Sequence, residues 1–547
     1  MWYLIHPVNR ARHATSAAGK ESVMKRASPV ALLLLTAGAP AWAQDAPAEA
    51  RSPAADPAPA VTQAPESSAP AVISHARGAR VSGPRPVAAQ RTPYPAEGAG
   101  WGPRAGRYFL SRWAEDWSFL GKPDPKRRRD RFDALKYIPL TDEGAVYLSL
   151  SNEERVRFNY ITSPGLRSGR DQDQFLLRNV VGADLHMGQY VRLYGELNSS
   201  QATGANPGVL NGNFRNDLII QQAFAEVNGD VAGLKVGVMA GRQEFSDGPP
   251  NLVNLRPAPD VYTTFNGVRI YVHGKRARAT AFDFKSTALG TGAFDDPIDR
   301  GERFRGINAS FNPPPFATPL GEARLFIDPF VYRYENDARR WGAETAADRR
   351  NFYGARLWGT MGELTMDATV TRQTGRFADR DVSAFAAFST FGYQLLRSGL
   401  QPRIGFHADW TSGGGYGSGT KKTFNPIFGS LPYFSWGNFV GPSNLAVLAP
   451  TLSITPLPRV RFNTEIEWLR RTNDRDAVYN GLTLPYARTQ AVRGADIGRL
   501  YRADMAWAAD PHVTVQLLFD YLDAGAVLNK ADYHDSVYVG GAITFRL

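Results

Sequence analysis

The sequence predicts an all-β fold, in which a single large antiparallel transmembrane β-barrel of about 18 strands follows a signal peptide and a disordered segment rich in proline and alanine. Three observations predict the barrel. Most of the chain after Ala145 alternates apolar and polar residues over stretches of strand length. The connections between these stretches alternate between short and long. The chain ends inside such a stretch, SVYVGGAITFRL, with a hydrophobic last residue.

The N-terminal segment predicts export from the cytoplasm. Residues 24–26 (MKR) form a basic n-region, residues 30–37 form a short apolar h-region, and residues 41–43 (AWA) fit a cleavage site. The apolar run is shorter than the ~20 residues that a membrane-spanning helix needs. We therefore expect a signal peptide over residues 1–43, with translation starting at Met24. A genuinely long n-region that begins at Met1 is the alternative.

Two segments separate this peptide from the expected barrel. Residues 44–100 are rich in Pro, Ala and Ser and bury too little apolar surface to offset the entropy of ordering, so we expect them to be disordered. Residues 101–144 contain clustered Trp and Phe without a clean period, and we expect a periplasmic lead-in or a short plug there. The run KRRRDR in this segment is typical of nucleic-acid binding in a cytosolic protein. In an exported chain we expect it to be solvated.

The expected barrel covers residues 145–547. In VRLYGELNS, residues 191–199, the apolar side chains share one parity, and Arg192 and Glu196 share the other. The preceding stretch, 175–187, alternates in the same way, and only Gly188, Gln189 and Tyr190 separate the two, which predicts a tight hairpin. Soluble sheets also alternate, so the lengths of the connections carry more weight.

Short and long connections are expected to lie at opposite ends of the barrel. The expected short ones are 187–189, 228–233, 274–276, 361–362, 456–458 and 509–512, with two somewhat longer ones near 312–321 and 394–401. The expected long ones are near 201–215, 243–264, 286–303, 336–349, 412–446, 470–495 and 523–533. Short periplasmic turns opposite long outer loops are typical of outer-membrane barrels, and an even number of strands puts both chain ends on the periplasmic side.

The last stretch predicts how the barrel closes. Its strand must pair with the first one so that no edge remains. Its odd-numbered residues, from Val537 to Leu547, are expected to face lipid. The apolar end also resembles the C-terminal signal that the outer-membrane assembly machinery recognises, although Leu547 stands where Phe is usual.

Charge and composition limit the classes of function. The formal net charge of +11 indicates a surface or channel that prefers anions, and export makes nucleic acid a poor candidate partner. The chain has no cysteine, which excludes disulfides, thiolate metal sites and a cysteine nucleophile.

Motifs for catalysis or cofactor binding are absent from the sequence. The eight histidines show no metal-binding spacing, no G-x-S-x-G appears, and the order Gly419-Thr420-Lys421 does not fit a phosphate-binding loop. We therefore expect no enzyme, no cofactor and no metal site. A calcium site formed by acidic residues 295–299 of an outer loop is an alternative to a solvated loop there.

Several stretches resemble the alginate-export family of outer-membrane β-barrels. They come in family order and cover nearly everything from Trp101 to Leu547. They are RWAEDWSFL (112–120), DALKYIPL (133–140), GRQEFSDG (241–248), FNGVRIYV (265–272), GARLWG (354–359), FNPIFGSLPYFSWGNFVGPSNL (424–445) and the closing strand. The resemblance implies a monomeric Gram-negative outer-membrane barrel that passes a polyanionic polysaccharide through a positively charged pore.

Arginines on the inner face of such a barrel would suit a chain of carboxylates, because guanidinium stays charged and can fork onto a carboxylate. By strand parity, the expected pore-lining basic residues are Arg155, Arg157, Arg178, Arg192, Arg242, Arg269, Arg356 and Arg461. Acidic residues expected on the same faces are Glu153, Asp184, Glu196, Glu244 and Glu465, of which Glu244 is included in the substrate pathway. The resemblance adds weight to the motifs GRQE, NGVR and ARLW. The alternative is that these arginines only neutralise lumen carboxylates.

The long segment Thr411–Leu445 begins with the glycine-rich run TSGGGYGSGTKK. Glycines make such a segment mobile, which suits a gate or lid. A plain flexible outer loop is the alternative.

Together these observations predict an outer-membrane channel that passes anionic saccharides without energy coupling, among them an alginate-like polyuronate for export. A general or substrate-specific anion-preferring porin for uptake is the first alternative, an outer-membrane enzyme the second, and a passive structural or adhesive barrel the third. The expected partners are the outer-membrane lipid bilayer, an anionic polysaccharide or other anions, and the assembly machinery.

Overall fold

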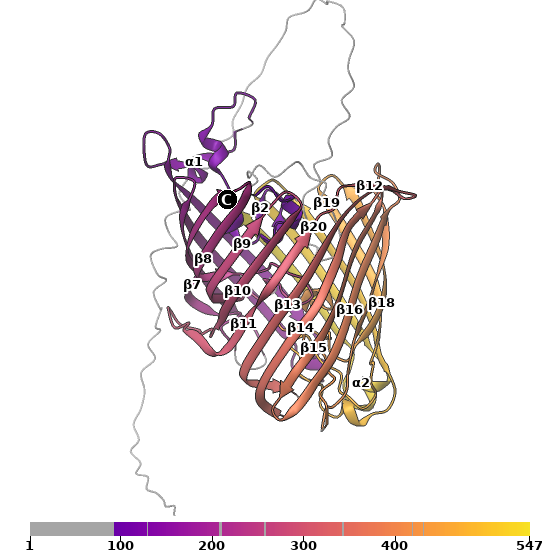
Figure 1. The fold of residues 1–547 in the computed structure, drawn as a ribbon. Helices are drawn as coiled ribbons and strands as arrows, with labels where there is room; N and C mark the ends of the chain where they lie inside the picture. The colour runs from indigo at the N-terminus through magenta and orange to yellow at the C-terminus, as the bar shows by residue number, and fades with distance from the viewer. Residues whose placement is uncertain are drawn as a thin grey trace, which may run out of the picture. The chain divides into compact units, whose positions relative to one another are not determined.

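The computed structural model describes residues 92–547, apart from 128, 207–209, 256–258, 342–343, 418 and 430. Within these residues, the eighteen strands β4–β11 and β13–β22 pair antiparallel and form a closed barrel, which confirms the predicted fold class (Figure 1). No helix in the described part of the chain has the length and apolar character needed to cross a membrane. The predicted signal peptide, and residues 44–91 of the predicted linker, lie outside the described residues.

The barrel strands vary in length from 9 to 21 residues. They are β4 (Val146–Ile161), β5 (Gln172–Met187), β6 (Val191–Thr203), β7 (Asn216–Val231), β8 (Leu234–Glu244), β9 (Thr264–His273), β10 (Ala277–Thr287), β11 (Ile298–Phe311), β13 (Gly321–Trp341), β14 (Glu344–Met361), β15 (Leu364–Phe377), β16 (Arg380–Gln394), β17 (Arg403–Thr411), β18 (Ala446–Leu457), β19 (Val460–Arg470), β20 (Asp496–Ala508), β21 (Val513–Ala524) and β22 (Ser536–Arg546). The other elements are short: β1 (Arg104–Ala105), β2 (Tyr108–Phe109), β3 (Ile138–Pro139), β12 (Phe316–Thr318), α1 (Asp133–Lys136), α2 (Ala526–Lys530), η2 (Ala96–Gly98), η3 (Arg112–Ala114), η4 (Ser118–Gly121), η5 (Pro164–Leu166), η6 (Leu431–Tyr433) and η7 (Thr489–Ala491).

The predicted alternation sets the two faces of the wall. On β5, Leu177 and Val181 are exposed on the outer surface, whereas Arg178 and Asp184 are buried on the lumen side. Lipid offers no partner for backbone N–H and C=O groups, so every strand must pair on both edges. The closed barrel meets this condition and turns the polar side chains of each strand toward the lumen.

Strand β22 closes the barrel, as the sequence predicts. It pairs with β4 from Tyr538 to Arg546. Val539 and Ile543 are 41% and 55% exposed on the outer face. On the inner face, Nε of Arg546 donates to Oε2 of Glu153 at 2.9 Å. A backbone ladder and a buried ion pair therefore join the first and last strands of the barrel.

Short and long connections lie at opposite ends of the barrel, as predicted, with one exception. Long loops over 204–215, 245–263, 412–445 and 471–495 share one end. We predicted a further long loop near 336–349, but this prediction was wrong. Strands β13 and β14 continue to Trp341 and Glu344, and still pair at Arg339 and Ala346. Beyond the lipid a strand needs no apolar face, so the charged sequence of this hairpin shows no alternation.

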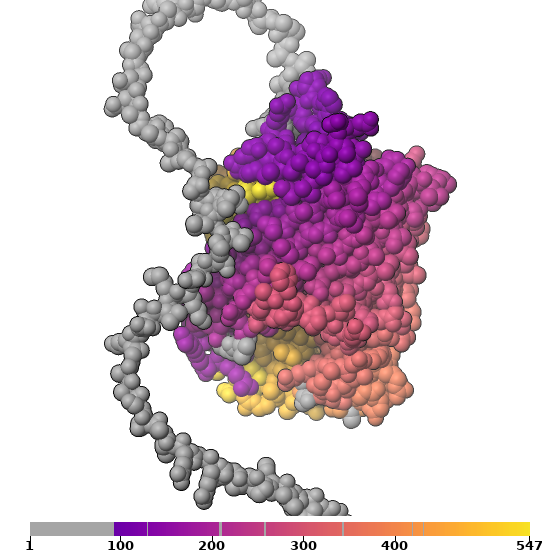
Figure 2. Space-filling view, turned by 90° about the vertical axis from the view of Figure 1, so that its left-hand side faces the viewer, coloured from indigo at the N-terminus to yellow at the C-terminus, as the bar shows by residue number. Residues whose placement is uncertain are grey.

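Residues 92–117, named here the N-terminal plug, lie inside the barrel near the end with the short turns. Trp101 packs against Tyr271 and His273 of β9, and Trp113 packs against Phe224 of β7. These contacts favour the plug over a lead-in for the first part of 101–144. The residues that follow, including α1, gather over the same end of the barrel (Figures 1 and 2).

We expect Val539→Arg to destabilise the barrel by about 2–4 kcal/mol, because a guanidinium on the lipid face loses its water. Urea unfolding in phospholipid vesicles, followed by tryptophan fluorescence, measures the change. Leu482→Arg in the exposed β19–β20 loop is the control, and it should change the stability by less than about 0.5 kcal/mol. Equal, small effects of both substitutions would contradict a lipid-facing position for Val539.

Candidate functional site

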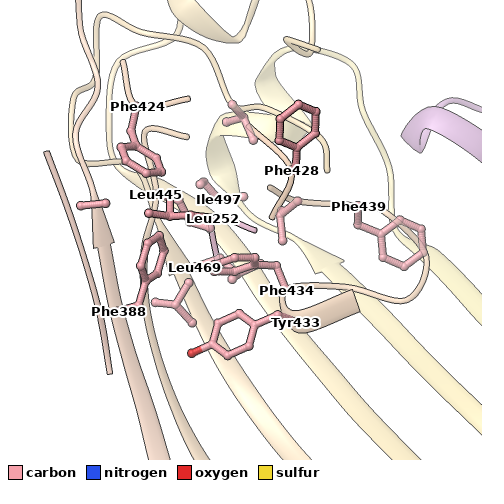
Figure 3. Packing of buried hydrophobic residues seen from close by; sticks show 14 of the residues in the cluster. Leu252, Phe388, Phe424, Phe428, Tyr433, Phe434, Phe439, Leu445, Leu469 and Ile497 are labelled. Atoms are coloured by element: carbon pink, nitrogen blue, oxygen red, sulfur yellow. The ribbon is translucent and has the colours of Figure 1, made fainter. Parts of the chain in front are cut away.

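Three segments fold into the barrel interior: the N-terminal plug, the β8–β9 loop (residues 245–263) and the β17–β18 loop (residues 412–445). Aromatic residues of the two loops join inward-facing aromatic residues of the strands in one large hydrophobic cluster. Figure 3 shows part of it, in which Phe424 and Phe434 of the β17–β18 loop lie near Phe388 of β16. Over part of the barrel, the polar side chains that face the lumen therefore contact these three segments.

Glu153 of β4 receives three guanidinium groups. Its Oε2 accepts from Arg112 of the plug at 3.1 Å and from Arg546 of β22 at 2.9 Å, and its Oε1 accepts from Arg178 of β5. Arg112 also donates to both carboxylate oxygens of Glu196 on β6, at 2.8 and 2.9 Å. A buried charge is costly unless it is paired, so these bonds fix the plug to the wall.

Two of the predicted pore arginines hold the β8–β9 loop. Arg155 pairs with Asp260 and donates to the Pro259 carbonyl oxygen at 3.0 Å. Arg178 lies over the ring of Tyr262, with its guanidinium carbon 4.1 Å from the ring centre, and donates to the Tyr262 hydroxyl at 2.9 Å. Both arginines face a folded segment of the chain.

Arg192 and Arg269 meet the N-terminal plug. Arg192 pairs with Asp184 and, at 3.1 Å, with Glu226, and it donates to the backbone carbonyl of Trp113. The guanidinium of Arg269 lies 5.1 Å from the ring of Trp101 and 5.2 Å from that of Trp113, distances typical of cation–π contacts. The plug thus uses aromatic faces and a carbonyl to cover lumen arginines.

Two further members of the predicted set lie on the inner face and are bonded to the wall. Arg157 donates to Asn159 at 2.8 Å and to the Tyr538 hydroxyl at 3.0 Å. Arg356 makes a two-bond pair with Asp367, at 2.8 and 2.5 Å.

Glu244 is buried at the end of β8. It accepts a hydrogen bond from Gln221 Nε2 at 2.9 Å and one from the hydroxyl of Ser111 in the plug. It therefore contacts the plug on the lumen side.

Arg242 does not lie with the other predicted pore arginines on the lumen side. It shares the parity of the exposed Val238 on β8 and lies opposite Asn266 in the register with β9. Its guanidinium donates to Asn266 Oδ1 at 3.0 Å and to the carbonyl oxygens of Ile220 and Asp296 at 3.0 and 2.7 Å. The side chain lies on the outer face near the ends of the strands, because the apolar residues of β8 fix that parity toward lipid.

A cavity of about 70 Å³ lies on the other side of the lumen, toward the short-turn end of β16–β20. Arg403, Arg461 and Arg502 line it, together with Asp504 and Trp436. Three arginines thus line one polar recess beside the β17–β18 loop.

Of these three arginines, sequence analysis predicted only Arg461. Strand parity could have identified Arg502, because Arg502 and Asp504 alternate with the outward Tyr501 and Trp507 on β20. Arg403 is the first residue of β17, and the alternation of the sequence does not assign a face to a residue at the very end of a strand.

Arg502 also anchors the β17–β18 loop. It bonds Glu465 and Glu467 at 2.9 Å each and Asp520 at 3.1 Å, and donates to the carbonyl oxygens of Pro432 and Tyr433 at 2.7 and 2.8 Å.

Asp520 of β21, directly opposite Arg502 in the register, also holds this loop, because it accepts from the Ser435 hydroxyl and from the N–H of Gly437 at 3.0 Å each. Residues 423–445 are mostly buried. This packing contradicts a plain flexible loop for that part of the segment, while its role as a gate stays a prediction.

His407, Glu465 and Glu467 form the one group of three metal-capable side chains found among the described residues, with ligand atoms within 4.8 Å of one another. Arg502 already bonds both glutamates at 2.9 Å. A divalent cation there would have to displace this guanidinium, so we assign no metal to the group.

Comparison with known proteins relates this geometry to one family. The family model described as "Alginate export" matches residues 146–542. A search of curated proteins finds no match.

Among solved structures, Pseudomonas aeruginosa OccK2 (OpdF), crystallised in complex with glucuronate, is 10% identical, with 73% of this chain and 98% of that chain covered and a TM-score of 0.46. Acinetobacter baumannii OccAB1 is 11% identical, with 76% and 99% covered and a TM-score of 0.48. Pseudomonas aeruginosa OccK5 (OpdH) is 12% identical, with 73% and 98% covered and a TM-score of 0.45.

We expect Arg112→Ala to loosen the N-terminal plug by about 3–5 kcal/mol, because Glu153 loses one buried partner and Glu196 loses its guanidinium. Hydrogen exchange of residues 92–117 in the folded barrel measures the loss of protection. Lys126→Ala, at an exposed position outside the plug, serves as control. Unchanged protection in Arg112→Ala would show that the ion pairs do not hold the plug.

The β17–β18 loop should depend on pH through Lys421. Burial lowers the pKa of Lys421 to about 8, and its ammonium lies 5.5 Å from the Trp341 ring. The unfolded chain binds this proton up to its ordinary pKa of about 10.4, so stability should rise from pH 8 toward 10. Urea unfolding at pH 7.5 and 9.5 should show a gain of about 1–2 kcal/mol that Lys421→Met abolishes. The same pH slope in both proteins would refute the assignment.

Proposed function

This chain belongs to the alginate export family, and we propose that it passes an anionic saccharide, of the alginate-like polyuronate class, from the periplasm across the outer membrane. The observation that carries the proposal is the recess at the periplasmic half of the lumen, which Arg403 and Arg461 line next to Arg502, the anchor of the β17–β18 loop. A Gram-negative outer-membrane barrel of this family supplies the setting, and the recess supplies fixed positive charge where a periplasmic substrate would enter.

The chemistry of the recess suits a uronate. Each sugar of a polyuronate carries one carboxylate, and a guanidinium binds a carboxylate through two parallel hydrogen bonds. Asn463, Thr451 and Ser453 also line the recess and offer hydrogen-bonding groups suited to sugar hydroxyls. Asp504 keeps the recess from holding an anion too tightly to release it, since conduction needs weak and repeated binding.

The remaining predicted arginines take part differently in this proposal. Arg155, Arg178, Arg192 and Arg269 meet the plug and the β8–β9 loop, so they become substrate contacts only after those segments move. The described conformation is then a closed one, and Arg461 is the member of the predicted set that is available at the start of transport. Arg157 and Arg356 stay bonded to the wall, and Arg242 lies outside the path.

Reversal potentials in planar bilayers under a KCl gradient test the proposal. A variant in which a glycine–serine linker replaces residues 424–443 should conduct with anion preference. In that background, Arg403→Ser with Arg461→Ser should shift the reversal potential toward cations and abolish blockade by uronate oligomers added on the periplasmic side.

The matched control removes two charges from exposed short turns, with Lys275→Ser and Arg397→Ser. This control should keep the selectivity of the shortened-loop protein. Cation selectivity, or equal blockade by neutral oligosaccharides, would overturn the polyuronate proposal and leave a barrel of another function.

A further inference from the structure

Pairs of like charges face each other across neighbouring strands on the outer surface of the barrel. Directly opposed in the register are Lys285 and Arg303 (β10 and β11), Arg305 and Arg333 (β11 and β13), and Arg349 and Arg376 (β14 and β15). We name these six residues the outer basic face. On β11 and β13 they share the parity of the exposed Ile307 and Val331. They lie toward the barrel end that is opposite the short turns, on strands that Figure 1 shows at its front.

Acidic residues neutralise this face only in part. The ion pairs are Arg303 with Asp283, Arg305 and Arg333 with Glu335 (3.4 and 2.7 Å), Arg349 with Asp337, and Arg376 with Asp381 (3.9 Å). Five arginines thus share four carboxylates, and Lys285 adds a sixth positive charge to the face. Like charges directly opposite each other on a sheet are destabilising, so the face has a net preference for an anion.

The other side of the barrel shows that this arrangement is not a general feature of its outer end. There, Arg499 of β20 lies directly opposite Asp523 of β21, and Arg470 of β19 lies opposite Asp496 of β20. These exposed arginines each have an acid across the strand. The outer basic face instead places arginine against arginine.

An apolar groove runs up to the same arginines. It has a volume of about 520 Å³ and is lined on its apolar part by Val268, Ile270, Ala281, Ile307 and Val331. Arg305 and Arg333 lie at its edge, together with Asp283 and Asn351. Because five neighbouring strands contribute to one groove, the wall is hollowed there on its lipid side. An acyl chain in this groove would place its head group at the arginines.

We propose that the outer basic face binds an acylated glycolipid of the outer leaflet through a phosphate group. The phosphate lies between Arg305 and Arg333, whose guanidinium groups both contact Glu335. One acyl chain fills the groove over Ala281. Guanidinium forks match phosphate oxygens, and the low dielectric at the membrane boundary strengthens the contact. The occupant relieves the repulsion between the opposed arginines and fixes the barrel at this depth in the outer leaflet.

Native mass spectrometry of the full chain in detergent micelles, titrated with diphosphoryl lipid A, tests the proposal. Arg305→Ser with Arg333→Ser should weaken binding at least tenfold, whereas Arg305→Lys with Arg333→Lys should retain most of it. Ala281→Trp should also weaken binding at least tenfold, because it fills the groove and leaves the arginines in place. Lipid A without phosphates should bind the unchanged protein at least tenfold more weakly.

Arg499→Ser is the matched control, since it removes an exposed outer arginine whose cross-strand partner is acidic, and it should bind as the unchanged protein does. Heat-modified gel mobility checks that every variant is folded. Equal binding by the serine variant, or equal binding of the dephosphorylated lipid, overturns the proposal. Competition by inorganic phosphate at the concentration of the lipid would show a simple anion site and would also overturn it.

Discussion

The carboxylate of Glu153 connects the closure of the barrel with the filling of its lumen. It accepts hydrogen bonds from Arg546 on the closing strand, Arg178 on β5 and Arg112 on the N-terminal plug. The side chain is fully buried, so it would carry a large desolvation cost without these guanidinium groups. The backbone ladders of β4 with β22 and β5 fix the position of Glu153. The ladders that close the barrel therefore also fix the position of the plug.

The lumen divides into two parts with different uses of arginine. On the side of β4–β9, arginines bind segments of the chain itself: Arg112 and Arg192 pair with acids around the plug, and Arg155 pairs with Asp260 of the β8–β9 loop. On the side of β16–β21, Arg502 fixes the β17–β18 loop through backbone carbonyls, and Arg461 lines the recess. Arginines thus hold folded segments in both halves, and in the second half Arg461 also lines a recess.

The barrel could be predicted from the sequence because lipid imposes a local rule on every strand. Each lipid-facing position must be apolar, so alternation in stretches such as that of β5 was enough to assign its inner and outer faces. The rule has no force beyond the bilayer, and there the prediction of a loop near 336–349 was wrong. The strand pairing of Arg339 with Ala346 in water left no pattern in the sequence.

The candidate site could be predicted only in part, because its geometry depends on contacts between distant segments. Parity placed Arg178 and Arg461 on the inner face, but nothing near them in the sequence indicated that Tyr262 covers the first and that the second lines a recess. Arg242 shows the converse: its motif suggested a pore position, whereas the apolar Val238 of its own strand turns it outward.

On the proposed function, an anionic substrate can replace some of the contacts that fill the lumen and not others. Arg155 is held by the carboxylate of Asp260, and a uronate carboxylate is an equivalent ligand for the same guanidinium. The substrate can therefore compete with the β8–β9 loop, because one carboxylate replaces another on the guanidinium of Arg155. In the contacts of the plug the charges are reversed: the plug supplies the cation, Arg112, and the wall supplies the carboxylates of Glu153 and Glu196. A polyanion cannot take the place of that guanidinium and is repelled by the carboxylates that its departure exposes. Release of the plug must then come from a cation or from a force on the N-terminal segment, so entry of substrate alone is not sufficient to open the lumen.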